Sequence, residues 1–230
     1  MTAAPLRLIS SMATREVLAE LVDAFTAREG HAVALESAGG VDVARRVRDG
    51  QAVDLVVLAA KAIDELIAAG RLLPDGRVDI LRSGIAIAVP AGAPLPDIRT
   101  EAALKQAVLA APTLSYSTGP SGVYLMGLFE RWGILEQIRP RIVQAPPGVP
   151  VGSLVARGEV ALGFQQLSEL LHVPGIALVG PMPPEVQSIT TFSGAVSRSA
   201  AHPEQARALL AWMTHADAAP AIRRQGMEPA

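Results

Sequence analysis

Apolar runs of strand length alternate with segments of helical periodicity along most of this 230-residue chain. Residues 55–58 form a continuous apolar run, which is typical of a strand covered on both faces of a parallel sheet. Residues 15–28 instead carry apolar side chains at helical spacing. Repeated strand–helix–strand units of this kind predict an α/β fold with mostly parallel sheets flanked by helices. Ligands of such sheets bind at the carboxyl ends of strands, near helix starts.

The predicted elements follow one another with short connections. The strands are expected at residues 6–9, 32–35, 54–58, 84–89, 113–116, 141–143, 161–164, 176–179 and 190–196. The helices are expected at residues 15–28, 43–48, 62–69, 101–109, 123–132, 150–157, 168–171, 206–213 and 220–224. Thr14 and His202 stand where they could cap the helices that follow them. Asp54 begins a strand, where we expect it to bind backbone amides at the sheet edge.

The strand–helix units restart near Ser83 and again near Ser188, which predicts two lobes. The first lobe would comprise residues 1–84 and 190–230, and the second residues 85–189. Segments 84–89 and 186–192 are the candidate strands that cross between the lobes. Two crossings would allow hinge closure around a ligand held in a cleft between the lobes.

Three segments rich in Ser, Thr and Gly each lead into a predicted helix: residues 10–14, 38–42 and 117–122. A helix start presents free backbone N–H groups and a partial positive charge, which suit an anion. Three such starts converging on one cleft would hold a small anion with few or no charged side chains.

The composition of the chain argues against binding of nucleic acid, membranes or metal ions. A net charge of −2 gives no field that would attract nucleic acid or an anionic membrane. The chain has no cysteine, and its four histidines lie far apart without neighbouring carboxylates at ligand spacing, so we expect no metal and no cofactor. No apolar run approaches the length of a membrane span. Without a leader pattern, the sequence as given predicts a cytoplasmic protein, or a periplasmic one whose leader was removed.

Several segments, taken in order, carry a resemblance to a known family. They are residues 11–14, 38–40, 53–57, 122–124 with 132–133, and 154–164. Over nearly its whole length the chain resembles the molybdate-binding-protein-like family of type 2 solute-binding proteins. The resemblance implies a two-lobed type 2 periplasmic-binding-protein-like fold and a small anionic ligand, either an oxyanion or an organic polycarboxylate. It also implies a membrane transporter as partner if the protein is exported.

The family's ligand contacts transfer to this sequence position by position. The resemblance places them at Ser10 or Ser11, at Gly39–Gly40 where molybdate binders offer Ser, at Ser121 with Gly122, at 149–151, and at Gln166 in place of Tyr. Glycine supplies only N–H donors and leaves room, and Gln both donates and accepts, which fits a carboxylate better than a bare oxyanion. The predicted ligand-binding residues are Ser10, Ser11, Thr14, Gly39, Gly40, Thr118, Ser121, Gly122, Pro150, Val151, Gln165 and Gln166.

Other segments resemble a subgroup of this family that acts as aconitate isomerase: residues 35–42, 115–123, 146–153, 163–169 and 223–227. Such an enzyme needs one group to remove a proton α to a carboxylate and one to return it. Tyr116 and Glu36 are the candidate catalytic residues, with a Ser–water pair as a further option. A polycarboxylate would also favour a cation, for which Arg15, Arg45 and Arg82 are candidates.

Alternative interpretations remain open at the level of sequence. Gly39–Gly40 could be a turn that needs positive φ, Glu36 an exposed strand-end carboxylate, and Tyr124 a packing residue. Three functions compete: a solute-binding protein, an aconitate isomerase-like enzyme and a cytoplasmic ligand sensor. The solute-binding interpretation accounts for the fold without requiring a catalysed reaction.

Overall fold

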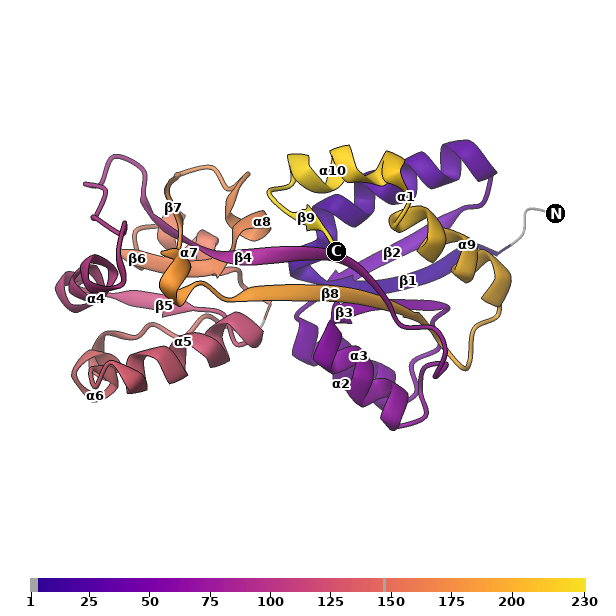
Figure 1. Ribbon diagram of the computed structural model, residues 1–230, viewed down its shortest axis with the longest axis horizontal. Helices are drawn as coiled ribbons and strands as arrows, with labels where there is room; N and C mark the ends of the chain where they lie inside the picture. The colour runs from indigo at the N-terminus through magenta and orange to yellow at the C-terminus, as the bar shows by residue number, and fades with distance from the viewer. Residues whose placement is uncertain (1–3, 147) are drawn as a thin grey trace. The chain divides into compact units, whose positions relative to one another are not determined.

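The computed structural model describes residues 4–146 and 148–230 (Figure 1). Its contacts divide the chain into two units. Unit 1 comprises Met1–Arg82 and Thr191–Ala230, and unit 2 comprises Ser83–Thr190. The lobes expected from the sequence end within two residues of these bounds, at 84/85 and 189/190. Two long strands, β4 (Val78–Pro90) and β8 (Ile189–Val196), contain residues of both units.

The sheet of unit 1 is built around three parallel strands. β1 (Leu6–Ser11) pairs with β2 (Val33–Ala38) on one side and β3 (Leu55–Ala59) on the other. β8 runs antiparallel to β3, and the short β9 (Glu228–Pro229) pairs with β4. The three parallel strands therefore end at one edge of the sheet.

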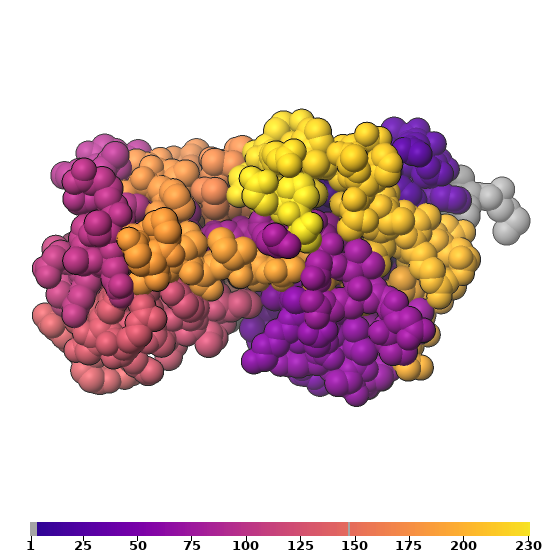
Figure 2. Space-filling view, viewed as in Figure 1, coloured from indigo at the N-terminus to yellow at the C-terminus, as the bar shows by residue number. Residues whose placement is uncertain are grey.

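Helices cover both faces of this sheet (Figure 1). One face packs against α1 (Arg15–Glu29), α9 (Pro203–Met213) and α10 (Ala219–Arg224), and the other against α2 (Gly40–Arg48) and α3 (Ala60–Ala68). The 3-10 turns of this unit are η1 (Met12–Thr14) and η4 (Ala216–Ala218). Figure 2 shows the C-terminal helices lying over the N-terminal part of the same unit. The indole of Trp212 fixes this packing by donating to the Leu21 carbonyl at 3.1 Å.

Unit 2 has its own sheet, in which most pairings are antiparallel, whereas the sequence predicts a mostly parallel sheet in each lobe. β4 pairs with β6 (Leu162–Gln166) and β7 (Ile176–Pro181), both antiparallel, and β6 pairs in parallel with β5 (Leu114–Tyr116). The helices are α4 (Glu101–Ala110), α5 (Pro120–Arg131), α6 (Leu135–Ile138), α7 (Val151–Ala156) and α8 (Leu167–Leu170), with 3-10 turns η2 (Arg139–Arg141) and η3 (Pro184–Val186).

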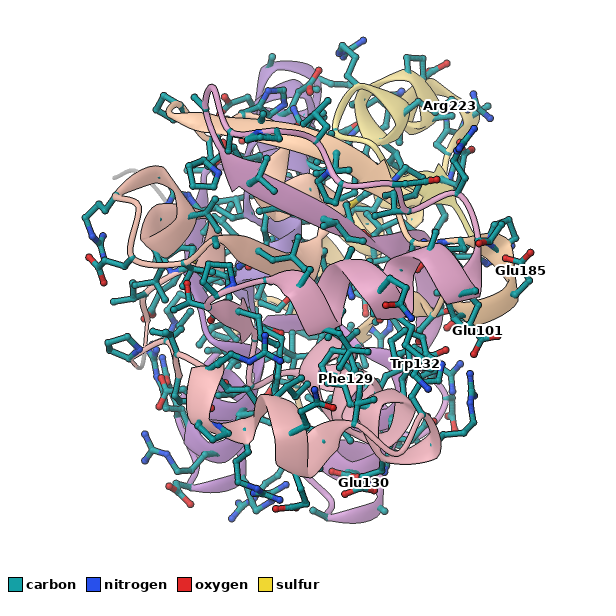
Figure 3. The ribbon with its side chains drawn as sticks, turned by 90° about the vertical axis from the view of Figure 1, so that its left-hand side faces the viewer. Glu101, Phe129, Glu130, Trp132, Glu185 and Arg223 are labelled. Atoms are coloured by element: carbon teal, nitrogen blue, oxygen red, sulfur yellow. The ribbon has the colours of Figure 1, made fainter. Side chains whose placement is uncertain are left out.

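Aromatic side chains fill the face of this sheet that α4 and α5 cover. Phe129 lies at the centre, with ring centroids 5.8 Å from Trp132 and 6.2 Å from Phe164. The Trp132 indole donates to Glu101 at 2.6 Å, which joins the end of α5 to the first turn of α4 (Figure 3). Aromatic contacts therefore contribute to the core on this face of the unit 2 sheet.

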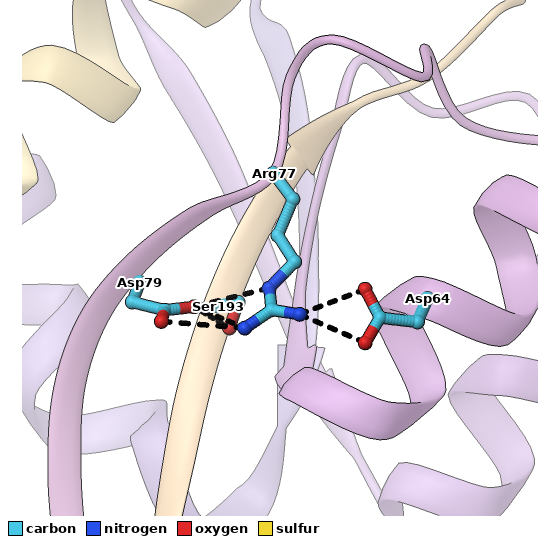
Figure 4. Close-up of polar contacts among 4 residues, drawn as sticks. All are labelled: Asp64, Arg77, Asp79 and Ser193. Carbon is cyan, nitrogen blue, oxygen red and sulfur yellow. Dashed lines mark hydrogen bonds and ion pairs between the residues drawn. The ribbon is translucent and has the colours of Figure 1, made fainter.

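A polar network holds α3 against the long strands of unit 1 (Figure 4). Arg77 donates both to Asp64, at 2.8 and 2.9 Å, and to Asp79, at 3.0 Å. Ser193 of β8 donates to Asp79 at 2.6 Å. The hydroxyl bond to Ser193, followed by the Arg77 guanidinium, outweighs burial and lowers the pKa of Asp79.

Two predictions about elements are wrong. The strand expected at 141–143 is absent; η2 ends at Arg141, and only Ile142 forms a bridge, to Leu114. Pro140 sits in the first turn of η2, where its fixed φ favours a helical turn over a strand. Thr14 and His202 do stand before α1 and α9, but neither side chain caps the helix. Thr14 instead donates its hydroxyl to the Ser11 carbonyl at 3.0 Å.

Asp54 binds backbone at the amino edge of the unit 1 sheet, as expected. Its carboxylate accepts from the amides of Arg7, Ala201 and His202 at 2.8, 2.6 and 3.0 Å. Burial alone would raise the pKa of this carboxyl, but the three amide bonds outweigh it and the pKa is lowered. One side chain thus ties β1 to the start of α9.

We expect Asp54→Asn to lower the free energy of unfolding by about 2–3 kcal/mol, because a buried carboxylate loses charge-assisted bonds and an NH₂ group faces amides. Urea unfolding at pH 7 measures this. The exposed Asp23→Asn is the control and should change little. The pKa of Asp54 in the folded state lies below its ordinary value of 3.8. Its contribution to the free energy of unfolding is therefore present above about pH 4 and is lost as the pH falls through the folded-state pKa. Equal stability of the two variants at pH 7 would contradict this account.

Candidate functional site

The carboxyl edge of the unit 1 sheet gathers hydroxyl groups. Ser10 of β1 lies opposite Ser37 of β2, and their side-chain oxygens are 2.8 Å apart. The hydroxyls of Ser11 and Thr14 are 3.4 Å apart where β1 turns into η1 and α1. Ser10, Ser11 and Thr14 are buried. The structure therefore brings the three predicted hydroxyl residues together and adds Ser37.

Gly39 and Gly40 bring the start of α2 to the same edge. Gly39 precedes the helix with φ −56°, and neither glycine has positive φ, so the interpretation as a turn that requires positive φ is wrong. A Cβ at Gly40 would lie 3.6 Å from the Cβ of Ser11. The helix therefore begins close to Ser11, and its first amides have no acceptor within the helix.

Glu36 faces elsewhere. Its carboxylate is half-exposed and forms an ion pair with Arg46 of α2. It borders a pocket of unit 1 together with Arg7 and Gln51, and neither Ser10 nor Ser11 lines that pocket. The structure thus places Glu36 as the exposed strand-end carboxylate of the alternative interpretation, apart from the serines.

In unit 2 the segment after β5 forms a tight turn into α5. Ser121 is buried, and its hydroxyl lies 2.8 Å from that of Ser117, while Thr118 is exposed. A Cβ at Gly122 would lie 1.6 Å from the Ser117 carbonyl oxygen, so only glycine fits there. Pro120 has no N–H and occupies the first turn, which leaves Ser121 as the first amide donor of the helix.

The start of α7 carries the predicted contacts Pro150 and Val151. Pro150 precedes the helix and has no N–H to offer, so only Val151 can donate a backbone bond there. The next amide, Gly152, already donates to Oε1 of Gln165 at 3.0 Å. Residue 147, within the segment 146–153 that carried part of the resemblance, lies outside the described residues.

Gln165 and Gln166 point to opposite sides of β6 and both find partners. Nε2 of Gln165 donates to Oε1 of Glu169 at 2.8 Å. Gln166 reaches Ser83 and Thr190 instead. With its amide nitrogen toward Ser83 it donates to that hydroxyl at 2.9 Å and accepts from Thr190 Oγ1 at 3.0 Å. We assign this orientation because the reverse one leaves only the Thr190 contact.

Glu169 was not among the predicted site residues. Burial raises the pKa of this carboxyl to about 7, although the bond from Gln165 lowers it in part. The sequence signal that pointed here was indirect: paired amides at a strand end need partners, and Glu169 is one of them. Ser37 could have been found from the strand register alone, since it faces Ser10.

Tyr116 lies in the aromatic core of unit 2, where its ring centroid is 6.1 Å from that of Phe129. Burial raises the pKa of its phenol, with the positive charge of Arg139 acting in the opposite sense. A phenol that is harder to ionise is less often present as phenolate at neutral pH, so less of it is available to act as a base. Tyr124, expected to pack, lies against the same core and donates its hydroxyl to the Val186 carbonyl at 2.9 Å.

The cationic candidates are engaged at the surface. Arg15 pairs with Glu16, and Arg45 with Asp42 of its own helix. Arg82 is exposed and acts on Asp79, whose pKa it helps to lower. Among residues 4–146 and 148–230, no three His, Cys, Asp or Glu side chains gather as they would around a metal ion. Within the same residues no helix is long and apolar enough to cross a membrane.

The family of bacterial extracellular solute-binding proteins matches residues 6–228. The chain belongs to this family. A curated relative, the aconitate isomerase of a Pseudomonas species, is 44% identical over 188 residues, which cover 81% of this chain and 71% of the relative. The predicted resemblance is confirmed.

Solved structures confirm the predicted fold. The periplasmic molybdate-binding protein of Azotobacter vinelandii superposes with a TM-score of 0.81 at 22% identity, covering 96% of this chain and 98% of that one. The sulfate-binding protein SubI of Mycobacterium tuberculosis H37Rv also superposes with a TM-score of 0.81. Its identity is 18%, and the match covers 99% of this chain and 88% of that one. At these identities the likeness shows that the fold is that of the type 2 periplasmic binding proteins.

We expect Gly122→Ala to destabilise the protein by at least about 1–3 kcal/mol, because the new methyl group meets a backbone carbonyl that cannot rotate away. Gly127→Ala is the matched control in the same helix, since its added Cβ meets nothing within 4 Å and should stabilise by about 0.5–1 kcal/mol. Thermal unfolding of both variants measures the difference. Equal effects of the two substitutions would show that the turn before α5 is not tightly packed.

Proposed function

We propose that this protein binds a small organic polycarboxylate and interconverts cis- and trans-aconitate. The observation that carries the proposal is the 44% identity with an aconitate isomerase over most of this chain. Membership of the solute-binding family supports the binding of a small solute, and the fold neighbours that bind molybdate and sulfate support an anion.

The residues at the two carboxyl edges fit an anionic ligand. Ser10, Ser11 and Thr14 in unit 1 and Ser121 in unit 2 offer hydroxyls beside helix starts whose amides lack acceptors. Glycine at positions 39 and 40 leaves space where the family's oxyanion binders place serine. These features favour a ligand larger than a tetrahedral oxyanion.

The reaction requires only the movement of protons. Aconitate has a methylene group α to one carboxylate and allylic to its double bond. Removal of a methylene proton gives an allylic carbanion, and return of a proton to the far carbon moves the double bond. A base with a pKa near the working pH performs both steps best.

A second candidate function is a solute-binding protein that performs no chemistry. Its support is the family itself, described as extracellular solute-binding proteins. In that case the protein would act outside the cytoplasm and deliver its anion to a membrane transporter. No observation in the structure favours a ligand sensor over these two.

Thermal unfolding with a ligand panel separates the candidates. We expect citrate, cis-aconitate and trans-aconitate to raise the midpoint by mass action, while molybdate, tungstate, sulfate and phosphate raise it little. Proton NMR should then show trans-aconitate accumulating from cis-aconitate. A shift with molybdate or tungstate alone would refute the isomerase, and a polycarboxylate shift without conversion would leave the binding protein.

We expect Ser11→Ala and Ser121→Ala each to weaken polycarboxylate binding by about 0.5–1.5 kcal/mol, the net value of one hydrogen bond. Calorimetric titration with trans-aconitate measures this. Ser199→Ala is the control, because Ser199 contacts Ser197 beside Asp54, at the opposite edge of the unit 1 sheet. Unchanged affinity in both site variants would remove these hydroxyls from the ligand.

A further inference from the structure

Glu169 lies at the carboxyl edge of the unit 2 sheet. It belongs to α8, which follows β6 without a break. β5 and β6 are parallel, so the segment with Ser117 and Ser121, which follows β5, leaves the sheet at the same edge. The carboxyl group is therefore placed where α/β sheets bind their ligands.

The orientation of the Glu169 side chain is set by Gln165. Because Oε1 of Gln165 accepts from the Gly152 amide at 3.0 Å, its Nε2 must point the other way, toward Glu169. That nitrogen donates to Oε1 of Glu169 at 2.8 Å. A base held by a third group in this way has a defined direction of attack.

The second oxygen of the carboxyl group, Oε2, is left available. Gln165 bonds to Oε1 and leaves Oε2 to other partners. Glu169 is half-buried, so its carboxyl group is not sealed from solvent. A substrate can therefore approach this atom.

Glu169 differs from the other carboxyl groups whose pKa values are shifted. Burial raises its pKa to about 7, whereas those of Asp54 and Asp79 are lowered by hydrogen bonds. At neutral pH both its forms are populated, which suits a group that takes a proton and gives it back. Glu36, the carboxyl candidate from the sequence, is tied to Arg46.

We propose that Glu169 is the proton-transfer residue of the isomerisation and that Gln165 is its positioning residue. This inference rests on the proposed function. Oε2 takes a proton from the substrate methylene, and the C–H electron pair becomes the new double bond. The far carbon of the old double bond then takes a proton from the same carboxyl group, and the electron pair of that double bond forms the new C–H bond. One proton is removed and one returned, so no co-reactant is needed.

The test compares Glu169→Gln with the wild type and with Glu185→Gln, an exposed control in η3. Binding is followed as the midpoint shift with propane-1,2,3-tricarboxylate, which has no double bond to move. Chemistry is followed by NMR as conversion of cis-aconitate and as deuterium entry from D₂O. We expect Glu169→Gln to keep the shift but to lose conversion and deuterium entry by 100-fold or more, with Glu185→Gln unchanged.

The outcomes are separable. Conversion by Glu169→Gln within threefold of the wild type overturns this inference alone. A wild type that binds the tricarboxylate without conversion or deuterium entry overturns the inference together with the isomerase, and leaves anion binding. A wild type that binds no polycarboxylate refutes the proposed function itself.

A second measurement tests the inference even if the Glu169→Gln variant fails to fold. For the wild type, kcat/KM should fall about tenfold per pH unit below about pH 7, because the carboxylate form is required. In Gln165→Leu this limb should move to higher pH, since the bond that favours the carboxylate is gone. A wild-type profile without a limb between pH 6 and 8, or a limb that Gln165→Leu leaves in place, overturns the assignment.

Discussion

Backbone amides that lack an acceptor are the constraint from which the candidate site follows. The first turn of every helix leaves such amides, and parallel strands that end together bring several helix starts to one edge. In unit 1 that edge carries Ser10, Ser11, Thr14 and Gly40. In unit 2 the corresponding edge carries Ser121. One amide at the start of α7, that of Gly152, already donates to Gln165. Hydroxyl side chains at these starts add donors without adding charge, which fits a site for anions.

Much of this arrangement could be predicted from the sequence because it depends on local patterns. The continuous apolar run of β3 and the amphipathic pattern of α1 give the element order. The role of Asp54 followed from its place at the start of a strand. Ser10 and Ser11 lie close to Thr14 along the chain, so any turn into a helix gathers them. The failure at 141–143 is also local, since Pro140 favours a helical turn over a strand.

What could not be predicted depends on contacts between distant parts of the chain. The raised pKa of Glu169 comes from burial, and the sequence signalled this residue only indirectly, through the paired amides of the preceding strand end. Gln166 was expected at the ligand, and only the structure shows that its amide also bonds to Ser83 and Thr190, which belong to other strands. Tyr116 ends a strand, yet the sheet turns it into the aromatic core. In each case the sequence gives the residue type, and only the tertiary structure gives its surroundings.

Holding a carboxyl group half-neutral at pH 7 has a cost in folding stability. Unfolding would return the pKa of Glu169 from about 7 to its ordinary value of 4.5, and a shift of this size corresponds to about 3 kcal/mol once the group is fully ionised. Between these two values the unfolded chain binds fewer protons than the folded chain, so the contribution of Glu169 to stability falls as the pH rises from about 4.5 and is lost once the pH passes about 7. Asp54 has the reverse effect in unit 1, where strong acid is the harmful condition. Glu169 and Asp54 therefore make opposite contributions to the pH dependence of stability, because the first favours the folded state when it is protonated and the second when it is ionised.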